Sequence, residues 1–136
     1  MLIGEYSIFR SALRMLLETD TNLRVVGEAS QLDIADQIIS EDTPDMIVVD
    51  LPDCGSKDHF SFFQHRNIPV LVLVGQYDIE VYQKCLKIGI NGLVLKEERA
   101  DTLFKAIEKI HGGEIWFDRT IMGATIRQLV TEKQML

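Results

Sequence analysis

Three ionisable residues stand at the ends of short apolar runs, and together they have the chemistry of a phosphoryl-transfer site. Glu5 follows the first run, Asp50 closes a run that begins at Met46, and Lys96 follows a run that begins at Gly92. A carboxylate can act as a nucleophile, a second carboxylate can bind a hard divalent cation, and an ammonium can neutralise a phosphoryl oxygen. Brought together, these side chains would form a site at which an aspartate is phosphorylated.

These side chains can meet only if the apolar runs are strands of one sheet. Five short runs rich in β-branched residues, with little polar alternation, are typical of strands that are buried on both faces. They lie at 1–3, 25–29, 46–49, 68–74 and 92–95.

Segments with the apolar period of a helix alternate with these runs. The predicted N-terminal caps are Ser7, Ser30 together with Asp33, and Asp78. Gly112-Gly113 predicts the end of another helix, because glycine readily adopts the left-handed conformation. A helix predicted at 58–66 is short and irregular in pattern, and a last helix is predicted after Asp118.

Strands that alternate with helices predict an α/β fold in which a parallel sheet is covered on both faces. Right-handed crossovers leave few topologies, and a doubly wound, flavodoxin-like sheet of five strands in the order 2-1-3-4-5 suits this length. Residues 1–117 are predicted to form this domain, and residues 118–136 an extra C-terminal helix or linker. Because ligands bind at the carboxyl ends of such strands, we expect Glu5, Asp50 and Lys96 at one edge.

Composition and charge exclude several classes of protein. The chain has 136 residues and a net charge of -7, from 14 Lys and Arg against 21 Asp and Glu. That sign argues against nucleic-acid binding by this domain alone. The apolar runs are too short to span a membrane, and no signal peptide pattern is present, so we expect a cytoplasmic protein. Cys54 and Cys85 lack a metal-ligand spacing and are expected to be reduced thiols.

Several segments resemble the receiver domain of two-component response regulators, in the NarL/FixJ-like subgroup with a C-terminal helix-turn-helix domain. The resemblance covers residues 1 to about 117. It is carried by Ser7–Arg10 with Leu13, Leu16 and Leu17, and by 25–29, 44–50, 69–73 and 89–96. By position, Asp50 falls on the phosphoacceptor, Glu5 on the metal-binding acid and Lys96 on the phosphate-contacting lysine.

Three positions depart from the pattern of this family. Gly4 precedes Glu5 where the family has two adjacent acids, so we expect weakened Mg²⁺ binding by Glu5 and Asp50. Val74 replaces a Thr or Ser whose hydroxyl bonds the phosphoryl group, and Leu93 replaces an aromatic switch residue. Losing a hydrogen bond to a charged group forfeits about 1.5–3 kcal/mol. We therefore predict a degenerate receiver domain in which phosphorylation at Asp50 is weakened or lost.

The resemblance implies a signalling module and not an enzyme. We expect it to control a transcriptional regulator through protein contacts, with a sensor histidine kinase as the implied phosphate donor. DNA would be bound only through a C-terminal domain that this chain does not contain, and no membrane contact is expected. We expect a homodimer, formed through the helix after Asp78, the strand at 92–95, the helix around Leu103–Ile110 and the last helix.

Two other functions stay open. A conventional phospho-accepting switch is supported by the three ionisable residues and opposed by the three departures. A small phosphatase or phosphotransferase could use Asp50 as its nucleophile, but haloacid-dehalogenase-type enzymes need two acids two residues apart, and Asp53 is three residues away. Lys96 could also serve only as a salt-bridge partner of Asp50.

Overall fold

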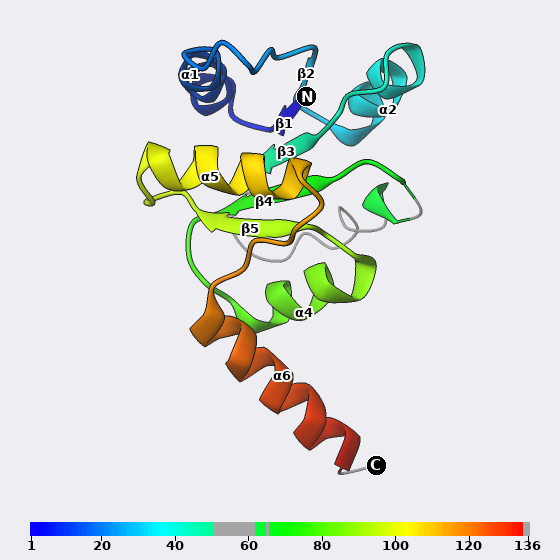
Figure 1. Ribbon diagram of the computed structural model, residues 1–136. Helices are drawn as coiled ribbons and strands as arrows, with labels where there is room; N and C mark the ends of the chain where they lie inside the picture. The colour runs from blue at the N-terminus through cyan, green and yellow to red at the C-terminus, as the bar shows by residue number, and fades with distance from the viewer. Residues whose placement is uncertain (51–61, 65, 135–136) are drawn as a thin grey trace.

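The strands of the computed structural model form one parallel sheet in the order β2-β1-β3-β4-β5, as predicted (Figure 1). The structure describes residues 1–50, 62–64 and 66–134. The strands are β1 (Leu2–Gly4), β2 (Glu28–Ala29), β3 (Ile47–Asp50), β4 (Val70–Val74) and β5 (Gly92–Leu95). Strands β1, β3, β4 and β5 are nearly or completely buried, which explains their continuous apolar sequences, whereas Glu28 of β2 is only half-buried.

Helices cover both faces of the sheet, as a doubly wound fold requires. The helices in the described ranges are α1 (Ser7–Leu17), α2 (Leu32–Glu41), α4 (Ile79–Ile88), α5 (Ala100–His111) and α6 (Arg119–Gln134). Side chains of α1 and α5 pack on one face, and those of α2 and α4 pack on the other. The predicted helix at 58–66 lies mostly outside the described residues, although Phe62 and Phe63 are helical. None of the described helices has the length and apolar character that a membrane span needs.

Strand β2 is shorter than the predicted run at 25–29. Leu2 lies opposite Glu28 in the β1–β2 pair, and the Leu2 amide donates to the Gly27 carbonyl at 3.0 Å. Strand β1 begins at Leu2, so it does not run alongside Val25, which is nevertheless buried in the core. Burial of Val25 and Ala29 accounts for part of the apolar pattern, although Val26 is exposed, and regular pairing is limited by the length of β1.

The two helix ends with the clearest signals are confirmed. The Asp78 carboxylate accepts a hydrogen bond from the Glu80 amide at 2.8 Å and caps α4. Helix α5 ends before Gly113, which has a φ of 93°. The Asp78 carboxylate pairs a backbone amide that the helix itself leaves unpaired. The left-handed conformation of Gly113 ends the helical path of the chain.

The predicted caps of α1 and α2 are wrong. Ser7 is already inside α1, and the extended residue before the helix is Tyr6, which makes no side-chain cap bond. Helix α2 begins after Gln31, again without a side-chain cap, so Ser30 lies one residue too early. A cap needs an extended backbone immediately before the first turn, and these serines are displaced from that position by one residue.

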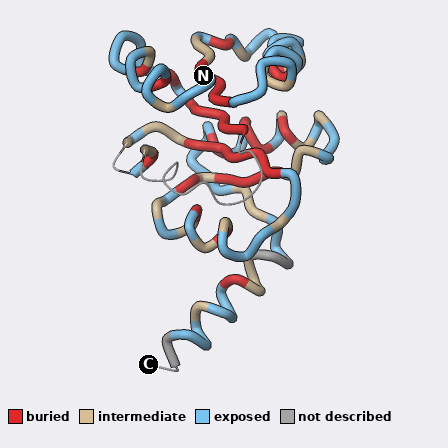
Figure 2. The backbone as a smooth tube through the Cα atoms, turned by 180° about the vertical axis from the view of Figure 1, so that it is seen from behind, coloured by how far each residue is buried: buried red, intermediate tan, exposed pale blue. Residues whose placement is uncertain are grey.

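After α5 the chain returns to the sheet before α6 begins. Trp116 forms a parallel bridge with Gly92 along the outer edge of β5. The Phe117 ring packs against Tyr82 of α4 at a centroid distance of 5.6 Å, and the Asp118 amide donates to the Tyr82 hydroxyl at 3.1 Å. Helix α6 then packs against α4 before it extends beyond the domain, where most of its surface is exposed (Figure 2).

The contact between α4 and α6 predicts a fall in stability at high pH. Burial raises the pKa of the Tyr82 hydroxyl and of the Cys85 thiol, each to about 12. Both groups ionise at lower pH in the unfolded chain, near 10 and near 9, so stability that is present below pH 9 is lost as the pH rises toward 12. Urea unfolding should show this loss, and Tyr82→Phe should reduce it, because only the parts due to Cys85 and to Tyr77, whose pKa is also raised by burial, remain.

The matched control is Tyr6→Phe, because the Tyr6 ring is exposed and lies away from α4. It should reproduce the wild-type dependence of unfolding free energy on pH. A Tyr82→Phe variant with the same slope as wild type between pH 10 and 12 would contradict the assigned role of Tyr82.

Candidate functional site

The strand register brings the predicted site residues to one edge of the sheet. Gly4 pairs with Asp50 across β1 and β3, and Asp50 pairs with Leu73 across β3 and β4. On the far side of β4, the Lys96 amide donates to the Val74 carbonyl at 2.8 Å. These residues therefore lie at the carboxyl edge, where ligands of such sheets bind.

An ion pair between Asp50 and Lys96 occupies the centre of this edge. Lys96 Nζ contacts Asp50 Oδ1, and the exposed fractions of the two side chains are 25% and 4%. The ammonium also lies 5.2 Å from the centroid of the Phe9 ring, in the range of a cation–π contact. The salt bridge considered from the sequence is therefore present, and it neutralises a carboxylate that is almost completely buried.

Glu5 differs from Asp50 and Lys96 in its exposure to solvent. It follows β1 and is exposed to solvent. Within the described ranges, no group of three or more Asp, Glu, His or Cys side chains could hold a metal ion. The described acids at this edge, with Lys96 already on Asp50, do not fit the Mg²⁺ ion that the resemblance implies, and no step through a metal follows from them.

Gly4 allows a close approach of β1 to Asp50. A Cβ atom built on Gly4 would lie 3.2 Å from Asp50 Cβ and 3.7 Å from Asp50 Oδ2. The first distance is tighter than ordinary Cβ contacts, so any larger residue here would force Asp50 to move by a few tenths of an ångström. Gly4 thus brings no side chain to this edge and leaves room around Asp50.

Sequence reasoning gave Arg10 no role, although it lies at this edge. Arg10 Nη1 donates to the Gly4 carbonyl at 2.6 Å, and Nε donates to Glu28 Oε1 at 3.1 Å. Hydrogen bonds from Arg14 and Arg10 hold the pKa of Glu28 below its usual value. The position of Arg10 in the first turn of α1 was a usable signal, because helical side chains point back toward the N-terminus.

The two side chains that the sequence predicts at phosphate-sensing positions are packed among apolar residues. Val74 and Leu93 are both buried and belong to the core cluster on the α2 and α4 face of the sheet. A buried hydroxyl without a partner would cost free energy at either place. These side chains supply shape to the core and no hydrogen bond to the edge.

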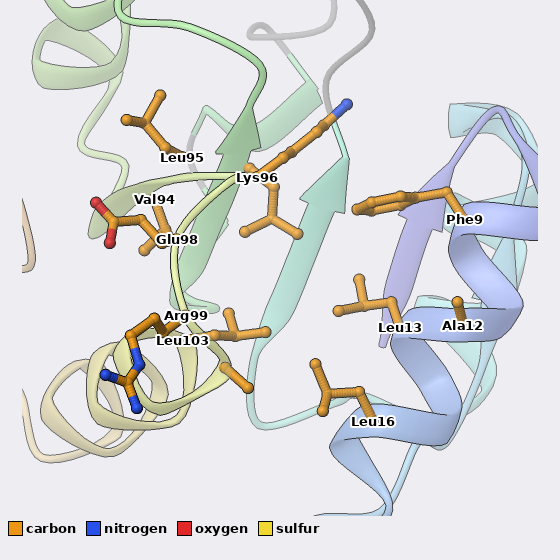
Figure 3. A pocket seen from close by; sticks show the side chains of 12 residues that line it. Phe9, Ala12, Leu13, Leu16, Val94, Leu95, Lys96, Glu98, Arg99 and Leu103 are labelled. Carbon is orange, nitrogen blue, oxygen red and sulfur yellow. The ribbon is translucent and has the colours of Figure 1, made fainter.

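A small apolar hollow lies beside Lys96 (Figure 3). Its volume is about 190 Å³, and it separates Phe9, Leu13 and Leu16 of α1 from Val94 and Leu103. Lys96 and Phe9 lie at the same end of the hollow. The lining supports the stem of Lys96 and holds the ammonium near Asp50.

The burial of Asp50 predicts unequal effects when the ion pair is broken. Lys96→Met leaves a buried carboxylate unpaired and should lower the free energy of unfolding by about 3 kcal/mol at pH 7. Asp50→Asn should cost less, because Lys96 reaches solvent, and the double variant should cost less than the sum of the single ones. Urea unfolding followed by circular dichroism measures all three.

Lys109→Met is the control, because the pair of Lys109 with Glu114 is exposed. It should stay within about 0.5 kcal/mol of wild type. Additive effects of Lys96→Met and Asp50→Asn would show that the two side chains do not interact in solution.

Residues 1–108 match the family model described as the response regulator receiver domain. A curated relative, the transcriptional regulatory protein YdfI of Bacillus subtilis, is 22% identical over 125 residues, which cover 90% of this chain and 59% of YdfI. The oxygen regulatory protein NreC of Staphylococcus epidermidis is 25% identical over 142 residues, covering 98% of this chain and 64% of NreC. The chain thus spans about three fifths of these relatives.

Solved structures agree with the fold. The crystal structure of a LuxR-family two-component response regulator from Aurantimonas sp. SI85-9A1 has a TM-score of 0.81, 26% identity and 96% coverage of both chains. The isolated REC domain of RcsB from Salmonella enterica serovar Typhimurium, in the presence of phosphomimetic BeF3-, has a TM-score of 0.75 at 19% identity, covering 89% of this chain and 93% of that one. Sheet order, site position and family match together show that this chain belongs to the response regulator receiver domain family.

Proposed function

We propose that this receiver domain is atypical and controls a transcriptional regulator through protein contacts, with phosphorylation at Asp50 weakened or lost. The observation that carries the proposal is the buried ion pair of Asp50 with Lys96. A carboxylate attacks phosphorus through an oxygen with an available lone pair, and the ammonium binds one of these oxygens. The contact with Oδ1 leaves Oδ2 able to attack, but the ammonium draws charge from the carboxylate and so weakens it as a nucleophile.

The residues around the ion pair support weak sensing of phosphate. Val74 has no hydroxyl, and the lost hydrogen bond to a phosphoryl group is worth about 1.5–3 kcal/mol. Moving a two-state switch from 1:99 to 99:1 requires about 5.5 kcal/mol of differential binding. The free energy of the missing hydrogen bond is therefore a large fraction of what a phosphorylation-driven switch needs. Leu93, which stands where the family has an aromatic switch residue, is buried and has no aromatic ring.

The proposed setting is a longer cytoplasmic regulator. The relatives include transcriptional regulators that are longer than this chain, which supports a C-terminal DNA-binding domain in the whole protein. The net charge of -7 supports DNA contact through that domain and not through this one. A sensor histidine kinase is the expected donor if Asp50 accepts phosphate, and catalysis by the domain itself is not expected.

The conventional switch is the second candidate, and it is favoured by the adjacency of Asp50 and Lys96 at the carboxyl edge. A phosphatase or phosphotransferase that uses Asp50 has less support. Asp53, the nearest following acid, is outside the described residues. Hydrolysis of an aryl phosphate that disappears in Asp50→Asn would favour that enzyme.

Phosphorylation is tested by intact-protein mass after incubation with acetyl phosphate and Mg²⁺. We expect little or no phosphate adduct on the folded wild-type domain, because Lys96 holds the Asp50 carboxylate. Asp50→Asn is the matched control for adducts at other residues. Stoichiometric adduct on wild type that is absent from Asp50→Asn would overturn the proposal in favour of the conventional switch.

We also propose that a second copy docks on the side of the domain formed by α4, β5, α5 and α6. The segment around Trp116 covers the β5 edge, and α6 covers part of α4, so α6 itself presents the outer surface. Ile126 and Val130, one turn apart on α6, are 50% and 49% exposed. A solved structure with the same fold contains two RcsB dimers bound to two parallel DNAs, which is compatible with pairing of receiver-containing chains.

Sedimentation at protein concentrations up to about 100 µM should show association that Ile126→Asp weakens, since a charge disrupts an apolar contact. Ile8→Asp is the matched control, because Ile8 is an exposed isoleucine on α1, which is not part of the proposed surface. A monomer at all concentrations, or association lost in Ile8→Asp and kept in Ile126→Asp, would refute this surface.

A further inference from the structure

We infer that the resident ammonium of Lys96 takes the place of a divalent cation at Asp50, and that Gly4 favours this arrangement by leaving room beside Asp50. The inference deepens the proposed function, on which it rests, by naming what weakens the site. It also goes beyond the loss of one metal-binding acid, because it assigns an active role to a lysine and a steric role to a glycine.

Charge and burial at Asp50 support the first part. The carboxylate is 4% exposed, and its Oδ1 is in contact with Lys96 Nζ. A divalent cation that used this carboxylate would lie within a few ångströms of the ammonium, and both are positive. Their repulsion is strong where water screens poorly, so metal and ammonium compete for the same carboxylate.

Packing at Gly4 supports the second part. The register places Gly4 directly beside Asp50, and its backbone φ is outside the left-handed range, so space is what the glycine provides. A Cβ at this position would stand 3.2 Å from Asp50 Cβ. Asp50 would have to give way by a few tenths of an ångström, which would alter the geometry of its contact with Lys96.

Arg10 adds a second cation at the same edge. Its guanidinium donates to the Gly4 carbonyl and to Glu28, and its side chain is 17% exposed. Glu28 balances the charge of Arg10, so the described acid left beside Asp50 for a metal ion is Glu5, which is exposed. A single exposed carboxylate binds Mg²⁺ weakly, because the ion loses hydration reluctantly.

The test uses Mn²⁺ as the probe, without any phosphate donor. Binding is measured by the electron paramagnetic resonance signal of free Mn²⁺, and its location by broadening of backbone amide resonances near residues 5, 50 and 96. Lys96→Gln should bind Mn²⁺ at least about tenfold more tightly than wild type, because it removes a positive charge beside the ion. Lys87→Gln, an equal charge change on the exposed side of α4, should leave the affinity almost unchanged.

Two substitutions at Gly4 separate space from charge. Gly4→Ala adds only a Cβ and should raise Mn²⁺ affinity by loosening the pair of Asp50 and Lys96, whereas Gly4→Asp should raise it further. If the glycine matters only as a missing ligand, Gly4→Ala will bind like wild type. Gly4→Ala also carries the test if Lys96→Gln fails to fold, as judged by circular dichroism.

The inference is overturned if Lys96→Gln and Gly4→Ala both bind Mn²⁺ no better than wild type. It is also overturned if wild type binds at Asp50 as tightly as Gly4→Asp does. The Mn²⁺ experiment uses no phosphate donor, so its outcome is independent of the acetyl phosphate experiment. A phosphate adduct on wild type in the acetyl phosphate experiment, together with tighter Mn²⁺ binding by Lys96→Gln, would refute the proposed function and leave this inference standing. No adduct in the acetyl phosphate experiment, together with unchanged Mn²⁺ binding by Lys96→Gln and Gly4→Ala, would refute this inference and leave the proposed function standing.

Discussion

A carboxylate that is almost completely buried needs a positive partner, and this requirement organises the edge of the sheet. The desolvation of an unpaired ion costs several kcal/mol, and the contact with the Lys96 ammonium offsets this cost at Asp50. Lys96 reaches it from β5, across the intervening strand β4. The order of the strands, the end of β5 and the apolar wall around the lysine stem all contribute to that one contact.

In the proposed function, the receiver fold keeps its shape while the chemistry of this edge changes. Val74 and Leu93 preserve close packing on the α2 and α4 face, so the core does not depend on a hydroxyl or an aromatic ring at these positions. Gly4 preserves the pairing of β1 with β3. In the proposed function, information enters through contacts with other proteins, and the strand ends serve mainly as a rigid, charge-balanced frame.

Much of this architecture could be predicted from the sequence, because buried parallel strands produce continuous apolar runs and their last residues must share an edge. The convergence of Asp50 and Lys96 follows from that rule. The steric role of Gly4 and the bonds of Arg10 could not be predicted, since they depend on how closely two backbones approach. The caps at Ser7 and Ser30 were wrong by one residue, and β2 was predicted too long because pairing depends on its neighbour β1 and not on its own sequence.

The segment between α5 and α6 fixes the start of α6 to the domain, while the far end of α6 extends away from it. Trp116 ties the segment to β5, and Phe117 and Asp118 tie it to Tyr82 of α4, so the start of α6 is clamped at two elements. With 16 residues, α6 is about 24 Å long at 1.5 Å per residue. A tilt of about 10° at the clamp would therefore move its far end by roughly 4 Å. Small displacements of α4 or β5 would become large ones at the point where the chain leaves the domain.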